Sequence, residues 1–81
     1  MIRLRNEKGV AIVDVMEDIG VETVDRFREV LQSGQASSSR LVLNLEGVGY
    51  MNSQAIGLIS AAKRHLSREA HGDLKIAHTT V

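Results

Sequence analysis

Residues 41–59 read LVLNLEGVGYMNSQAIGLI and combine three kinds of local signal. The apolar run Arg40–Leu45 is typical of a buried β-strand, and the glycines of Glu46–Met51 indicate a loop. Asn52 and Ser53 offer side-chain oxygens that can cap a helix, and apolar residues recur at helical spacing after them. This polar pair is therefore predicted to lie just beyond the carboxyl end of a central strand, where open α/β sheets usually place their sites.

The chain before this stretch is predicted to hold two further strands and a helix. Met1–Arg5 and Val10–Met16 are the strands, joined by a turn at Asn6–Gly9. The second strand is nearly continuous in apolar character, as expected for a strand covered on both faces. Apolar residues at spacings of three and four predict a helix over Val21–Leu31, with Gly34 as its stop signal. Together with the strand that follows, these elements make a βαβ unit with a parallel strand pair.

The second helix is predicted to run to about Ala70 and to end at Gly72 and Asp73. Its buried stripe is predicted to consist of Ala55, Leu58, Ile59, Ala62 and Leu66. Leu74–Ala77 begins a fourth strand. We therefore expect an α/β fold, in a single domain spanning residues 1–81, with a mixed sheet of about four strands and two main helices.

Length and composition restrict the class of protein further. Eighty-one residues allow one domain, and 43% hydrophobic with 25% charged residues is an ordinary globular balance. The aromatic residues are Phe27 and Tyr50, so the core is expected to be aliphatic. The chain has no cysteine, which excludes a disulfide and a thiolate metal site.

The charge balance argues against nucleic acid and membranes as partners. Ten Lys and Arg oppose ten Asp and Glu, so no overall field attracts anionic polymers or lipid. The basic group Lys63–His65 with Arg68 lacks interleaved aromatic residues, which favours a solvated helix face over a nucleic-acid site. No apolar run approaches the roughly 18 residues of a membrane span, and the charged N-terminus differs from a signal peptide. The expected location is the cytoplasm.

No constellation of residues predicts catalysis. Gly47-Val48-Gly49 begins a dinucleotide-binding fingerprint, but its third glycine would fall at Asn52. Ser53 would need a base nearby to act as a nucleophile, and His65 lies about three turns further along the same helix. The three histidines have no metal-ligand spacing. We therefore predict no enzyme activity, no cofactor and no metal.

Two roles stay open for Ser53. As the helix N-cap it would contribute about 1 kcal/mol to stability. As a phosphorylation site it would hold a phosphate where free N–H groups and the helix dipole favour negative charge, so the modified domain would stay folded. A partner docked over that helix end would have to desolvate the phosphate. A penalty of about 3 kcal/mol would weaken binding about 150-fold.

The stretch quoted above resembles the signature of the STAS domain family, the anti-sigma factor antagonists. The family pattern is an apolar strand with Asp-Leu-Ser-Gly-Val, two or three residues, and then Asp-Ser-Ser-Gly-Leu-Gly. Asn44–Val48 stands for the first part and Asn52–Gly57 for the second, with the Gly-Val pair, the serine and the final glycine in register. The departures include Asn44 and Asn52 for the two aspartates, Gln54 for the second serine, and Ala55 for the first glycine.

This resemblance implies both a fold and a function. The implied fold has its helices largely on one side of the sheet, and the family's closing helix is expected to be missing because the chain stops at Val81. The implied protein is a bacterial anti-sigma factor antagonist, which binds an anti-sigma factor that is a Ser kinase and so releases the sigma factor. Phosphorylation at the position of Ser53 would dissolve the complex, and a phosphatase would reset it. The expected partner-binding residues are Tyr50, Met51, Asn52, Ser53 and Gln54.

A second reading within the same family remains open. A kinase that recognises the acidic residue would bind a site with Asn52 less well. The departures therefore weigh against regulated phosphorylation more than against the fold. Family members also serve as scaffold subunits of stress-sensing assemblies or as accessory subunits of lipid transporters. Such a role would suit a homo-oligomer, because a net charge of zero does little to oppose self-association.

Overall fold

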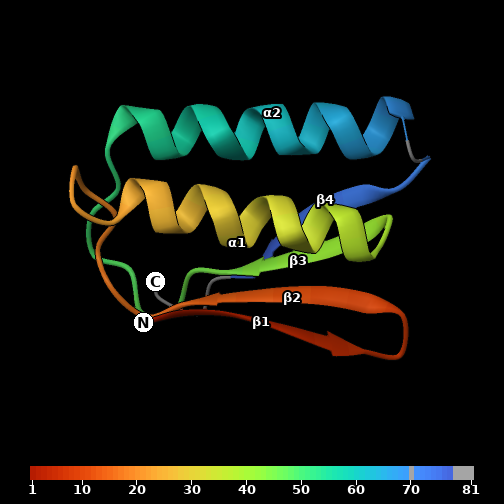
Figure 1. Cartoon of the computed structure of the whole chain (residues 1–81), viewed down its shortest axis with the longest axis horizontal. Helices are drawn as coiled ribbons and strands as arrows, with labels where there is room; N and C mark the ends of the chain where they lie inside the picture. Colours follow the sequence, from red (N-terminus) through yellow and green to blue (C-terminus); the bar gives the residue numbers. More distant parts are fainter. Residues whose placement is uncertain (70, 78–81) are drawn as a thin grey trace.

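The protein forms a four-stranded mixed β-sheet with two helices on one of its faces (Figure 1). The structure is a computed structural model that describes residues 1–69 and 71–77. The strands are β1 (Ile2–Glu7), β2 (Val10–Val15), β3 (Arg40–Asn44) and β4 (Asp73–Ala77), and the helices are α1 (Val24–Ser37) and α2 (Ser53–Glu69). This arrangement confirms the predicted α/β fold.

The connections explain why both helices lie on the same face. β1 and β2 form an antiparallel hairpin, and its turn residues Lys8 and Gly9 have positive φ angles of 52° and 81°, as tight hairpin turns favour. β2, β3 and β4 are parallel neighbours in chain order, so α1 and α2 are successive crossovers in one direction. Because such crossovers are almost always right-handed, both helices fall on one side of the sheet.

The core between the sheet and the helices is aliphatic apart from Phe27, as the composition predicts. Its larger members include Val13, Val15, Ile19, Phe27, Leu31, Leu41, Leu43, Leu66 and Leu74. The predicted stripe of α2 is confirmed, with Ala55, Ala62 and Leu66 buried and Leu58 and Ile59 packed against them in part. Neither described helix combines the length and apolar character that crossing a membrane requires.

The predicted limits of the first helix were wrong at both ends. Val21 is 85% exposed and lies in a turn, because the carbonyl of Gly20 accepts hydrogen bonds from the backbone N–H groups of Thr23 and Val24. Gly34 does not stop the helix but is buried within it. A Cβ at this position would lie 2.9 Å from Cδ1 of Leu41, so the glycine allows α1 to approach β3 closely.

The prediction that β2 is covered on both faces was also wrong for the described residues. Both helices pack on the face that holds Ala11, Val13 and Val15, while Val10 and Ile12 on the other face stay partly exposed. The prediction about a missing closing helix concerns chain beyond Ala77 and lies outside the described residues.

Candidate protein-binding site

The predicted partner-binding residues follow β3 and open α2, at the end of the sheet where the parallel strands finish (Figure 1). Tyr50, Ser53 and Gln54 are exposed, whereas Met51 and Asn52 are partly buried. The loop after β2 lies at the same end, because β2 and β3 run parallel. The candidate site is thus the first turn of α2 together with two loops.

The two loops are fastened together along their backbones. The N–H of Ile19 donates to the carbonyl of Tyr50, and the N–H of Asn52 donates to the carbonyl of Ile19, both at 2.9 Å. Oδ1 of Asp18 accepts from the N–H groups of Gly49 at 2.8 Å and Tyr50 at 3.0 Å. The sequence indicates only a connector around Asp18, because its partners lie some 30 residues away and leave no local signal. These bonds fix the position of Tyr50 and make the loops one surface.

The loop glycines serve packing rather than phosphate binding. A Cβ at Gly47 would lie 2.8 Å from the Cα of Met16, and a Cβ at Gly49 would lie 3.3 Å from Oδ1 of Asp18. Gly47 is therefore explained by the close approach of the loop to the backbone at the end of β2, and Gly49 lies against the side chain of Asp18 in the connector. These contacts account for the partial fingerprint seen in the sequence.

Asn52, not Ser53, is the N-cap of α2. Oδ1 of Asn52 accepts a hydrogen bond from the N–H of Ala55 at 2.9 Å, and its carbonyl accepts from Ile56 at 3.3 Å. Ser53 is the first helical residue, is exposed, and makes no side-chain hydrogen bond within residues 1–69 and 71–77. The first turn also contains no acidic residue, so the positive end of the helix dipole is not offset there. The hydroxyl of Ser53 is thus exposed and takes no part in capping the helix.

The cap assignment predicts unequal effects from two alanine substitutions. Asn52→Ala should lower the free energy of unfolding by about 1 kcal/mol, because the N–H of Ala55 loses its acceptor. Ser53→Ala should change it by less than about 0.5 kcal/mol, as is usual for an exposed side chain without partners. Urea denaturation of both variants measures the difference. Equal losses, or a larger loss for Ser53→Ala, would contradict the assignment.

Exposed apolar side chains lie on the same elements as the predicted partner-binding residues and on the loop fastened to them. They come from both loops and from the first turns of α2, and they are Met16 (47% exposed), Val21 (85%), Tyr50 (58%) and Ile56 (54%). A shallow hollow of about 210 Å³ beside them is lined by Leu45, Val48, Gly49, Tyr50 and Met51. Small-molecule sites are usually larger and more enclosed, about 300–1,000 Å³. Exposed apolar surface of this kind instead suits a protein partner.

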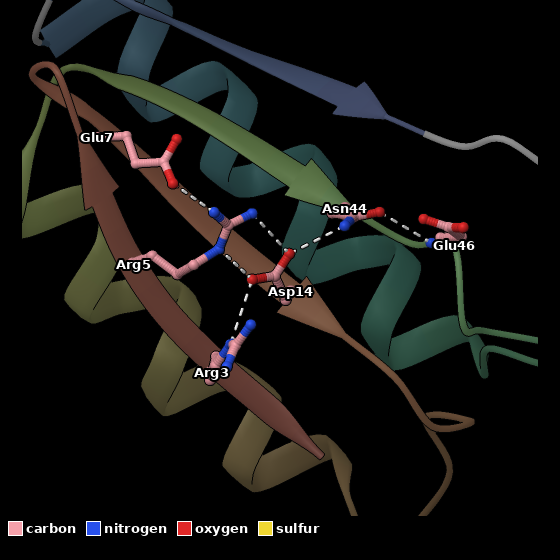
Figure 2. A network of polar contacts seen from close by, with 6 residues as sticks. All are labelled: Arg3, Arg5, Glu7, Asp14, Asn44 and Glu46. Carbon is pink, nitrogen blue, oxygen red and sulfur yellow. Dashed lines mark hydrogen bonds and ion pairs between the residues drawn. The ribbon is translucent and has the colours of Figure 1, made fainter.

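An ionic network centred on the buried Asp14, with partly exposed partners, lies close to the start of the site loop (Figure 2). Asp14 on β2 is 2% exposed and accepts from Nε of Arg5 at 2.5 Å and from Nδ2 of Asn44 at 2.9 Å. The hydrogen bond from Arg5 is the main cause that lowers the pKa of Asp14. Oδ1 of Asn44 in turn accepts from the N–H of Glu46, the first loop residue. The network explains Asn44: its amide donates to Asp14 and accepts from the loop at once, which an ionised carboxylate at this position could not do.

The other predicted groups do not assemble into a reactive centre. Ser53 and His65 are separated by about 18 Å of helical rise. Lys63 pairs with Asp73 at 3.3 Å, while Arg64 and Arg68 are exposed on α2. Within the described ranges, no three His, Cys, Asp or Glu side chains are grouped as metal ligands.

Comparison with known proteins gives a match to a family model and several solved structures with a similar fold. A family model described as the STAS domain matches residues 1–78. SpoIIAA, an anti-sigma factor antagonist solved in its unphosphorylated form, superposes with a TM-score of 0.81 at 15% identity, covering 100% of this chain and 76% of that one. An anti-sigma factor antagonist from Mycobacterium paratuberculosis gives 0.84 at 18% identity, covering 99% and 68%. The Bacillus cell fate determinant SpoIIAA in its phosphorylated form gives 0.75 at 17% identity, covering 100% and 74%. No curated protein matches the sequence.

Proposed function

We propose, because the chain belongs to the STAS domain family, that it is a bacterial anti-sigma factor antagonist acting in the cytoplasm. In this proposal it is a binding module and not an enzyme. It binds a kinase-type anti-sigma factor through the surface around Ser53, and phosphorylation of Ser53 releases that partner. The observation that carries the proposal is the free, exposed hydroxyl of Ser53 at the start of α2, where Asn52 performs the capping.

The helix end is suited to hold a phosphate without unfolding. A phosphate on Ser53 would lie beside N–H groups of the first turn that have no intrahelical partner, and it would meet the positive end of the helix dipole. Asn52 adds no negative charge next to it. The phosphate carries about −1.5 to −2 charges, so a partner that covers this end must remove its hydration. Release of the partner follows from that cost.

Gly57 supports a partner that approaches α2 closely. It lies one turn beyond Ser53 on the same exposed side of the helix, and a Cβ there would meet no atom within 4 Å. Packing within this chain therefore does not require glycine, which destabilises a helix interior by about 0.5–1 kcal/mol relative to alanine. Close contact with a backbone or a bulky side chain of the partner at this position would explain why the residue is glycine.

The proposal is tested by titrating the protein against the Ser-kinase anti-sigma factor of its source bacterium by calorimetry. Ser53→Asp should weaken binding about tenfold, and the more highly charged phosphoserine about 150-fold. Ser53→Ala should bind like the parent but accept no phosphate from ATP and the kinase. Ser33→Asp, the same change at an exposed position of α1, serves as the matched control and should bind normally. Unaltered binding by Ser53→Asp would refute the phosphorylation switch.

The second candidate function is a scaffold or accessory subunit, which Asn52 favours because a neutral cap replaces the family's acidic residue. The same titration separates the two functions. A scaffold would bind its partner, or assemble with itself, without any phosphate transfer to Ser53. A phosphatase would then have no substrate on this chain.

A further inference from the structure

The face of the sheet opposite the helices is not covered by any element within the described residues, and Figure 2 looks onto it. Val10 and Ile12 of β2 and Val42 of β3 form an apolar strip there. Ile12 and Val42 are direct neighbours in the parallel pairing, and all three side chains are partly exposed. β-Strands with parallel neighbours are normally covered on both faces. β2 therefore has more apolar side chains than α1 and α2 can bury.

The strip is too shallow for a small molecule. A hollow of about 100 Å³ lies over it, lined by Val10, Arg40, Leu41, Val42 and Lys75. Enclosed ligand sites are several times larger. Apolar side chains projecting from another protein element would fill such a surface better than a metabolite.

The charged side chains around the strip indicate which charge a partner should carry. Arg3 and Arg5 on this face are already engaged by Asp14 and Glu7. Arg40 and Lys75, which flank the strip, have no carboxylate within 4 Å among the described residues.

Asp73 stands beside Arg40 in the strand register, but its carboxylate is bonded to Lys63 of α2 at 3.3 Å. The strip is therefore bordered by two available cations. Two copies meeting face to face would bring these cations together, which disfavours a homodimer through this surface.

We propose that this face docks an acidic amphipathic helix of a partner protein. A helix with apolar residues at spacings of three and four would cover Val10, Ile12 and Val42, and acidic residues on its flanks would pair with Arg40 and Lys75. Ser53 begins α2 on the other side of the sheet, so this partner and one bound at Ser53 do not compete for the same surface. The protein would then connect two proteins.

The test uses a blocked helical peptide with Leu at spacings of three and four and Glu on both flanks, and a twin in which Lys replaces each Glu. Amide chemical shifts of the isotope-labelled protein follow both titrations. The Glu peptide should bind at least about tenfold tighter than the Lys peptide and shift Val10, Ile12 and Val42. Arg40→Glu combined with Lys75→Glu should reverse that preference. Arg64→Glu combined with Arg68→Glu, the same charge change on exposed α2, should keep it.

Several results would overturn the proposal. They are absence of binding, equal affinity for the two peptides, or shifts confined to α2 and the loops around Ser53. Concentration-dependent shifts of the strip without any peptide would show that a second copy occupies it instead. The double variant should remain folded, because Arg40 and Lys75 make no ion pair in the described structure, and its amide spectrum reports this directly.

Discussion

Gly72→Ala is expected to lower the free energy of unfolding by about 3 kcal/mol, at the upper end of what overpacking usually costs. A Cβ on Gly72 would lie 1.6 Å from the carbonyl oxygen of Ser39 and 2.5 Å from its carbonyl carbon. Both atoms belong to the backbone just before β3, so no side-chain rotation can relieve the clash. The backbone itself must move.

Hydrogen bonds on both sides hold Gly72 in place. Its N–H donates to the carbonyl of Leu66 at 2.7 Å, and the N–H of Asp73 donates to the carbonyl of Ser39 at 3.0 Å. Moving Gly72 away from Ser39 therefore disturbs the end of α2 or the start of the β3–β4 pairing. Urea denaturation measures the loss.

Gly57→Ala is the matched control for this substitution. Its added methyl group meets no atom within 4 Å, so the variant should gain about 0.5–1 kcal/mol of stability. Opposite signs for the same chemical change would show that the clash with Ser39, and not the added methyl group in itself, causes the loss. A Gly72→Ala protein as stable as the parent would show that the backbone around Ser39 can move away from the added methyl group at little cost.

Local sequence patterns predict the helices and strands of this fold, but they do not predict the tertiary contacts made at its glycines. Periods of two to four residues locate the strands and helices, and the handedness of crossovers places both helices on one face. Gly34 and Gly72 look like helix stops in the sequence, yet Gly34 lies against the side chain of Leu41 in β3, and Gly72 is required by its contact with the backbone of Ser39 just before β3. At the end of α2 the positive φ angle belongs to His71, at 52°, and not to Gly72.

The site is predictable only in its local part. The residues after β3 and the choice of Asn52 or Ser53 as cap follow from the sequence, and the structure assigns the cap to Asn52. Asp18 and Asp14 could not be found in this way. The partners of Asp18, and Asn44 as a partner of Asp14, are about 30 residues distant, while Arg3 and Arg5 reach Asp14 across the hairpin. A carboxylate in a connector or a strand carries no periodic signal. Such contacts appear only when strands and loops are brought together.

Asn44→Asp is expected to destabilise the protein by about 3 kcal/mol at neutral pH, although it restores the family's usual residue. Nδ2 of Asn44 donates to Oδ1 of Asp14 at 2.9 Å, and the variant would replace this donor with a second carboxylate. A charge-assisted hydrogen bond is lost and two like charges are brought together near a buried group. Arg3 and Arg5 offset part of the repulsion, but Glu7 already shares Arg5.

The pH dependence should differ in sign between parent and variant. In the parent, Arg5 lowers the pKa of Asp14 in the folded state, so its contribution is complete above the unfolded pKa of about 3.9 and is lost as pH falls toward the folded value. In Asn44→Asp, repulsion raises the pKa of one carboxyl of the pair above its unfolded value. That carboxyl binds its proton more readily when folded, so the variant should recover stability relative to the parent as pH falls from neutral toward about 4.

Urea denaturation of both proteins across this pH range measures the effect, with Asn6→Asp at an exposed position as the control. The control should differ from the parent by less than about 0.5 kcal/mol at neutral pH. A constant deficit for Asn44→Asp at every pH would mean that lost packing, and not charge, is responsible. Parent-like stability at neutral pH would mean that Arg3 and Arg5 can neutralise both carboxylates. In that case Asn44 would not be needed as the donor to Asp14.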